Sequence, residues 1–134
     1  MSIDLFHNKI TKKESISINP LVFAYIGDAV YEVIIRNYLI NSNMNMNVHK
    51  LHIKATGYVK AKAQCEYMKV ILDRLNEEEL SVFKRGRNAK SYTSPKNADI
   101  VDYRMATGFE ALIGYLYITD QEGRINQLLE NLID

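Results

Sequence analysis

The stretch of residues 21–40 restricts the folds open to this chain more than any other feature. It follows Asn19 and Pro20, which are typical of a helix N-cap and first turn, and it contains no helix breaker other than Gly27. Apolar side chains lie on most sides of a helix with this sequence, so it has no broad polar face for solvent. We therefore predict that residues 21–40 form the central, buried helix of a helical bundle.

A second helical segment is predicted at residues 48–72, after an Asn-rich loop at residues 41–47. Its apolar residues recur with a helical period, which directs them inward and leaves the lysines outside. The inward positions are Val48, Leu51, Ala55, Val59, Met68 and Ile71.

Two capping patterns mark the second half of the chain. Asn76 with Glu79 resembles a capping box and predicts a helix that runs to about Arg87. Residues 86–95 combine Gly, Asn, Ser, Thr and Pro without apolar periodicity, which predicts an exposed loop. Asn97 is then expected to cap a further helix, whose many apolar residues indicate a buried position.

These segments, with a short final helix at residues 122–133, predict an all-α fold. The chain has no alternating strand pattern, internal repeat or Gly-rich phosphate loop, which disfavours an α/β nucleotide-binding fold. A length of 134 residues fits one domain. We expect residues 1–134 to form that domain, with residues 1–18 as an N-terminal extension.

Composition excludes several classes of protein. The single cysteine, Cys65, leaves no disulfide framework and no CxxC site, and is interpreted as a small buried apolar residue. Residues 1–10 carry Asp4 and His7 where a signal peptide needs an apolar stretch, and no later run approaches the roughly 18 apolar residues of a membrane span. We expect a cytoplasmic protein with no membrane partner.

The formal net charge of +1 conceals a segregation of charge along the chain. Residues 50–69 hold five Lys or Arg residues against one Asp or Glu, and residues 84–104 hold six against two. Local basic segments on a nearly neutral chain are typical of a surface that binds a polyanion. Charge alone equally allows two solvated helix faces.

Carboxylates interrupt two of the apolar helices. Asp28, Glu32 and Arg36 share one face of the first helix, where Glu32 is expected to pair with Arg36. Glu110 lies in the middle of the fourth helix. Asp28 and Glu110 both adjoin small residues, which allow another helix or a phosphate backbone to approach closely. If they converge, they would suit Mg²⁺, although buried ion pairing is the alternative.

Two motifs carry a resemblance to a known family. The sequences YIGDAVYE at residues 25–32 and FEALIGYLY at residues 109–117 resemble the two signature helices of the ribonuclease III endonuclease domain. The basic sequence KRGRNAKSYTSPKNAD between them, with YVKAKAQ before it, is similar to mini-ribonuclease III, the short bacterial form without a double-stranded-RNA-binding domain. The resemblance covers residues 19–133.

The resemblance implies an all-helical homodimer that cleaves double-stranded RNA with Mg²⁺. Asp28 and Glu110 match the metal-binding, catalytic carboxylates of the two motifs, and Glu66 is aligned more loosely with a third acidic residue. Ala24 and Thr107 stand where full-length ribonuclease III has further carboxylates, which leaves fewer metal ligands per site.

The resemblance also implies the substrate and its contacts. It points to the precursor of large-subunit (23S) ribosomal RNA, cut to leave 5′-phosphate and 3′-hydroxyl ends. Recognition is expected to depend on A-form shape more than on base edges. The residues expected to bind RNA are Lys60, Lys62, Lys84, Arg85, Arg87, Lys90, Tyr92 and Lys96.

Two other functions remain open from the sequence. A non-catalytic module that binds double-stranded RNA or the ribosome would explain Ala24 and Thr107. A helical protein-interaction domain would explain the basic segments as solvated faces. Metal-dependent cleavage separates the ribonuclease from both alternatives. Salt-sensitive RNA binding separates the non-catalytic module from the protein-interaction domain.

Overall fold

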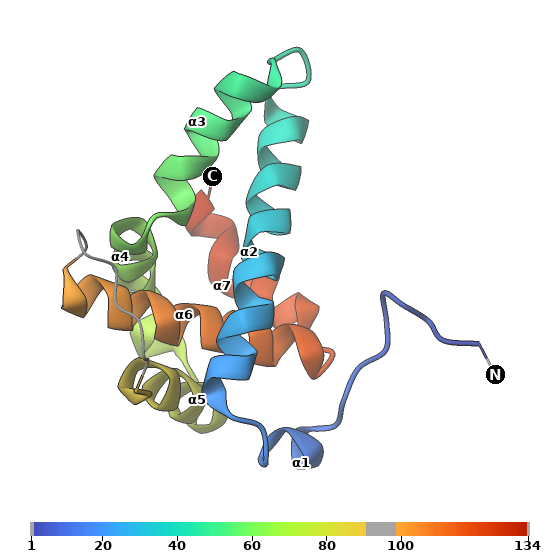
Figure 1. Ribbon diagram of the computed structural model, residues 1–134, viewed down its shortest axis with the longest axis vertical. Coiled ribbons are helices and arrows are strands. Elements are labelled where there is room, and N and C mark those ends of the chain that lie inside the picture. The colour runs from blue at the N-terminus through green and yellow to red at the C-terminus, as the bar shows by residue number, and fades with distance from the viewer. Residues whose placement is uncertain (1, 91–98, 134) are drawn as a thin grey trace.

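The computed structural model describes residues 2–90 and 99–133, which form helices and no strand (Figure 1). This architecture confirms the predicted all-α fold. The helices are α1 (Lys12–Ser15), α2 (Pro20–Ser42), α3 (Val48–Val59), α4 (Ala61–Ile71), the 3₁₀ turn η1 (Leu72–Arg74), α5 (Glu77–Asn88), α6 (Ile100–Ile118) and α7 (Glu122–Ile133). Within these two ranges, no helix is long and apolar enough to cross a membrane.

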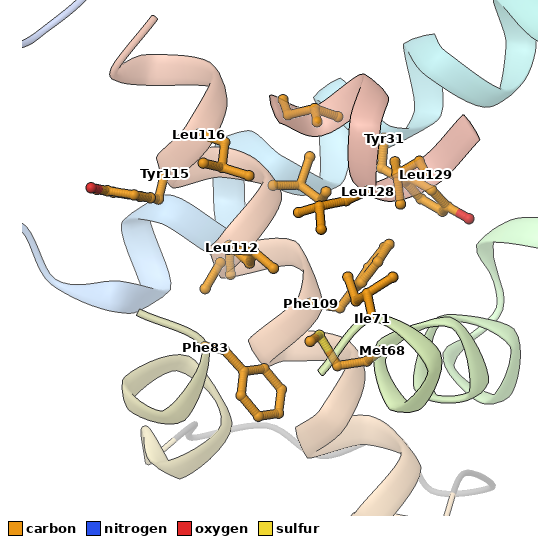
Figure 2. Close-up of a cluster of buried hydrophobic side chains, with 14 of the residues drawn as sticks. Tyr31, Met68, Ile71, Phe83, Phe109, Leu112, Tyr115, Leu116, Leu128 and Leu129 are labelled. Atoms are coloured by element: carbon orange, nitrogen blue, oxygen red, sulfur yellow. The ribbon is translucent and has the colours of Figure 1, made fainter. Parts of the chain in front are cut away.

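The central helix is α6, which packs against α2, α4, α5 and α7 (Figure 1). Its Phe109, Leu112 and Leu116 are completely buried. Figure 2 shows them among side chains from the surrounding helices, including Tyr31 of α2 and Met68 of α4. The core therefore forms around the helix that carries Glu110.

Residues 21–40 do form a helix, but the prediction that it is the central, buried helix is wrong. Asn19 does cap α2, because its side chain accepts a hydrogen bond from the Leu21 amide. One stripe of α2 is buried, but Tyr25 is 81% exposed and Val33 is 65% exposed. Among the described residues, no helix covers the apolar residues on this far side.

Two glycines allow α2 and α6 to cross in backbone contact. A Cβ atom added to Gly27 would lie 1.8 Å from the carbonyl oxygen of Glu110, and one added to Gly114 would lie 1.8 Å from that of Phe23. No side chain fits at either position, so the absence of a Cβ is what permits this distance between the helices. The crossing fixes the neighbourhood of Asp28 and Glu110.

Residues 48–72 form two helices where one was predicted. The break is at Lys60, whose backbone is extended (φ −63°, ψ 152°). At this break the Tyr31 hydroxyl donates to the Tyr58 carbonyl at 3.0 Å, and the Gln64 amide donates to the Val59 carbonyl at 2.9 Å. These contacts satisfy carbonyls at the end of α3 and stabilise the change of direction. Val48, expected to point inward, is 80% exposed.

The start of α5 confirms the predicted capping box. The Asn76 side chain accepts from the Glu79 amide and the Glu79 side chain accepts from the Asn76 amide. Glu79 is also buried against Arg124 of α7, at 2.8 Å from its Nε atom. The first turn of α5 is therefore tied to α7.

The loop predicted at residues 86–95 begins later than expected. Gly86 is buried in α5, where an added Cβ would lie 2.6 Å from the Cβ of Ala111. Contact with α6 thus keeps the end of α5 helical. Asp99 is the N-cap of α6, with its Oδ1 atom 2.7 Å from the Val101 amide. The predicted cap, Asn97, lies outside the described residues.

Candidate active site

The crossing of α2 and α6 brings Asp28 and Glu110 together. Asp28 follows Gly27 on α2, and Glu110 lies one helical turn before Gly114 on α6. The two carboxyl groups are in hydrogen-bonding contact. Asp28 is exposed and Glu110 is half-buried, so the pair adjoins both the protein interior and solvent. Two carboxylates from separate motifs thus form one acidic site.

The environment of Glu110 disfavours its negative charge. Burial raises the pKa of this carboxyl group to about 8, and the charge of Asp28 and its hydrogen bond add to the effect. A hydrogen bond from Gln64 acts in the opposite direction. A carboxyl group in this setting holds a proton near neutral pH unless a cation replaces that proton.

Ion pairing does not account for Asp28 and Glu110. Neither carboxyl group pairs with a Lys or Arg side chain in the described ranges. Glu32 does pair with Arg36, at 3.2 Å between Oε2 and Nε, as the sequence predicts. Glu32 therefore has a partner of its own, and the two carboxyl groups at the crossing are left facing each other.

The third residue at this site is Gln64 of α4, which the sequence analysis missed. Its Nε2 atom lies 3.4 Å from Oε2 of Glu110. Gln64 lies one turn before Met68 and two turns before Ile71, both buried, so the helical period that identified the inward face of α4 also includes Gln64.

The structure does not bring Glu66 to the acidic site. Glu66 is exposed and pairs with Lys69 at 3.6 Å, on a different face of α4 from Gln64. In the part of the chain that the structure describes, no three His, Cys, Asp or Glu side chains could together hold a metal ion. The site therefore offers two carboxylates.

Ala24 and Thr107 offer no carboxylate. Ala24 is buried, at 7% exposed, one helical turn before Asp28. The Thr107 hydroxyl donates to the Tyr103 carbonyl of its own helix at 3.0 Å. The donor set is consequently smaller than the four carboxylates that full-length ribonuclease III would supply.

The basic residues expected to bind RNA lie on two parts of the fold. Lys60 and Lys62 are exposed at the break between α3 and α4, next to the Val59 carbonyl that binds Gln64. The other described ones belong to the end of α5 or follow it directly: Lys84, Arg85, Arg87 and Lys90. Tyr92 and Lys96 lie outside the described residues.

Two of the arginines of α5 have partners within the chain. Arg85 donates to the Ile18 carbonyl at 3.3 Å. Arg87 donates to Oδ1 of Asn88 at 3.1 Å, and its guanidinium carbon lies 5.4 Å from the centre of the Phe83 ring. Lys84, Arg85 and Arg87 thus project from an ordered helix that extends to Asn88, slightly beyond its predicted end, and Lys90 follows this helix.

Comparison with known proteins identifies the class to which this fold and site belong. The model of the Ribonuclease III domain matches residues 21–121, and the chain belongs to this family. Within it, the chain is similar to proteins named mini-ribonuclease 3. That of Clostridium tetani is 53% identical over 126 residues, covering 94% of this chain and 83% of the relative. That of Thermoanaerobacter is 49% identical over 121 residues, covering 90% and 84%.

A solved structure has a similar fold. The X-ray crystal structure of a protein from Fusobacterium nucleatum matches with a TM-score of 0.80 and 31% sequence identity, covering 89% of this chain and 95% of that one. The comparisons confirm the predicted ribonuclease III fold and the resemblance to mini-ribonuclease III. The chain is thus a ribonuclease, a hydrolase that acts on RNA.

Proposed function

We propose that this ribonuclease cleaves double-stranded RNA as a Mg²⁺-dependent homodimer, with Asp28 and Glu110 as the catalytic carboxylates of each subunit. The observation that carries the proposal is their convergence at the Gly27–Gly114 crossing without a basic partner in the described ranges. Positions from both family motifs meet there, within the residues matched by the Ribonuclease III domain.

The donor set fits Mg²⁺. Carboxylate oxygens are ligands that Mg²⁺ prefers, and Mg²⁺ commonly binds through one or two protein carboxylates plus waters and substrate phosphates. When bound, the ion polarises the scissile phosphate and lowers the pKa of water, which supplies the chemistry of phosphodiester hydrolysis. Asp28 and Glu110 would hold the ion, and Glu110 would give up its proton to do so. The expected product ends are 5′-phosphate and 3′-hydroxyl.

The basic residues are placed to bind the phosphates of the RNA. We propose that Lys60 and Lys62 contact phosphates beside the acidic site, because they come just before Gln64, whose side chain reaches Glu110. Lys84, Arg85, Arg87 and Lys90 would bind phosphates along α5, with Tyr92 and Lys96 following in the sequence. Phosphate contacts position a duplex without reading its sequence, so the protein would recognise its RNA substrate by A-form shape.

The proposed substrate is the precursor of large-subunit ribosomal RNA, in the cytoplasm. Its support is the similarity to mini-ribonuclease 3 proteins over most of the chain. A ribosomal RNA precursor offers long A-form stems, which suit recognition through phosphate contacts.

The apolar face of α2 supports the homodimer. Val22, Tyr25, Val33 and Ile40 are each more than half exposed on this helix. An open groove of about 900 Å³ lies beside it, lined mostly by apolar residues of α2 and α7, with some polar residues of both helices and part of the N-terminal segment. Contiguous apolar surface of this kind is typical of an interface, and a two-fold dimer would present one acidic site to each RNA strand.

The small donor set favours one rival function. With Ala24 and Thr107 in place of further carboxylates, the rival proposal is a non-catalytic module, a degenerate member of this family that has kept the fold and binds double-stranded RNA without cutting it. Such a module would bind a duplex with strong salt dependence but would not cut it.

One experiment separates the two functions. The purified chain is incubated with a long RNA duplex, with a single strand of the same sequence and with a DNA duplex, each in Mg²⁺ and in EDTA. We expect cleavage of the RNA duplex only in Mg²⁺, with 5′-phosphate ends. Salt-sensitive binding of the duplex without cleavage would assign the chain to the non-catalytic module.

A further inference from the structure

Gln64 is a buried amide between a helix end and the acidic site. The residue is only 3% exposed. Its Nε2 atom donates to the Val59 carbonyl at 2.9 Å and to Oε2 of Glu110 at 3.4 Å. Both N–H groups of the amide are therefore used, one on the backbone and one on the carboxylate.

The other half of the same amide has no partner. Oε1 of Gln64 is buried and accepts no hydrogen bond in the described part of the chain. A buried amide oxygen without a partner destabilises a fold, whereas an apolar side chain of the same length would not incur this cost. The inward face of α4 is otherwise apolar at this point, with Met68 and Ile71 completely buried. Packing alone does not explain a glutamine at position 64.

The backbone break at Lys60 explains how Gln64 is held. Because α3 ends at Val59, the Val59 carbonyl is available to a side chain. Gln64 spans the distance from this fixed carbonyl to Glu110, so the orientation of one carboxylate oxygen is set by the backbone. Gln64 does not bind the other oxygen of Glu110.

We propose that Gln64 is a positioning residue for the ribonuclease reaction, which holds Oε2 of Glu110 so that the carboxylate presents its other oxygen to a divalent cation. This inference rests on the proposed function of Asp28 and Glu110. Partners that orient a metal-binding carboxylate commonly affect metal affinity about 10- to 100-fold when they are removed.

The test compares Gln64→Met with the matched control Gln127→Met. Methionine keeps the length of the side chain and removes the amide, and Gln127 is exposed on α7. Mn²⁺ binding is measured by electron paramagnetic resonance without RNA, and thermal melting follows the fold. We expect Gln64→Met to raise the Mn²⁺ dissociation constant about 10-fold or more, while its Tm stays within about 5 °C of the parent. The control should change neither value.

Cleavage adds a second readout. In Gln64→Met the Mg²⁺ concentration for half-maximal rate should rise, and the rate at saturating Mg²⁺ should fall, with little change in duplex affinity. A Gln64→Met protein that binds Mn²⁺ and cleaves like the parent would overturn the proposal. So would a variant that melts early but keeps the parental Mn²⁺ affinity, since that result assigns Gln64 a role in stability alone.

A measurement on the unmodified protein covers the case in which Gln64→Met fails to fold. The side-chain amide signals of Gln64 and Gln127 are followed by ¹⁵N NMR during a Mg²⁺ titration. We expect the Gln64 signal to shift and the Gln127 signal to stay. An unmoved Gln64 signal during cation binding at Asp28 and Glu110 would overturn the positioning role. A parent that binds no cation would overturn the proposed function itself, and the role of Gln64 with it.

Discussion

The ionisation of Glu110 depends strongly on its surroundings. Its carboxyl group is half-buried, in contact with Asp28, and bound by one N–H of Gln64. Loss of a proton from this group creates a charge that burial and Asp28 both disfavour. The stability of the metal-free protein and its affinity for cations should therefore both change with pH.

The first prediction concerns this pH dependence. The pKa of Glu110 is raised from 4.5 to about 8. Between these values the unfolded chain has lost a proton that the native state keeps, so the free energy of unfolding falls as pH rises, by a few kcal/mol from this group. Urea unfolding in EDTA at pH 5 and pH 8 should show a smaller decrease for Glu110→Gln than for the parent.

Mg²⁺ should reverse part of that decrease, because the ion replaces the proton and binds the native state. Stability in Mg²⁺ should therefore fall less between pH 5 and pH 8 than in EDTA. An equal decrease in the parent and in Glu110→Gln would show that Glu110 does not hold a proton in the native state.

Sequence patterns identified Asp28 and Glu110 but not Gln64. The two carboxylates stand out because they interrupt apolar helices and lie within family motifs. Gln64 lies among the apolar residues of a segment that was predicted to be one helix. Its contacts depend on the break at Lys60, which separates α3 from α4. Glu66 was selected because it aligns loosely with a third acidic residue of the family, whereas the direction of the side chain decides that Gln64 reaches Glu110 and Glu66 does not.

At the scale of the helix, the crossing of α2 and α6 is the feature on which the site depends. Gly27 and Gly114 permit a distance between backbones that no other residue allows. The sequence showed small residues beside both carboxylates, and these did indicate a close approach. It did not show that α6 would be central, because α2 is equally apolar and its far side is exposed in this chain.

The second prediction tests this crossing. Gly114→Ala places a Cβ 1.8 Å from the Phe23 carbonyl oxygen, so the helices must separate. We expect a loss of about 3 kcal/mol in the free energy of unfolding, with a loss of cleavage. The matched control is Gly57→Ala, where an added Cβ meets nothing within 4 Å and higher helix propensity should stabilise by up to about 1 kcal/mol. A Gly114→Ala protein as stable as the control would contradict the crossing.

The third prediction concerns the end of α5. If Arg87 and Lys90 each neutralise about one phosphate, the double variant Arg87→Ala, Lys90→Ala should flatten the slope of log Kd against log salt by about 1 to 2 units. Affinity should fall similarly for duplexes of different sequence. The control is Lys12→Ala, Lys13→Ala on α1. A slope unchanged from the parent would place the RNA along Lys60 and Lys62 instead.

At the scale of the whole molecule, the exposed apolar face of α2 has no partner within residues 2–90 and 99–133. Tyr25 and Val33 lie on it, beside the groove shared with α7. The apolar residues on most sides of the segment at residues 21–40 predicted a helix that is covered on most sides. One chain covers only part of it, and a second copy is the partner that we propose.

The fourth prediction tests the dimer. Val33→Glu adds a charge to the proposed interface at a position that is 65% exposed in the single chain. The fold should be retained, but light scattering at micromolar concentration should report a monomer, where the parent is a dimer. The monomer should no longer make paired cuts in both strands. A parent that is monomeric, and still makes such cuts, would rule out this assembly.

The most direct test of the central claim is single-turnover cleavage of a labelled RNA duplex by the parent, Asp28→Asn and Glu110→Gln in saturating Mg²⁺. Each amide keeps the volume of the side chain and removes its charge. Loss of the several kcal/mol that a bound metal ion supplies corresponds to a rate decrease of about 10³-fold or more, with circular dichroism and duplex affinity close to those of the parent. Near-normal turnover in either variant would contradict the assignment of Asp28 and Glu110 as the catalytic pair.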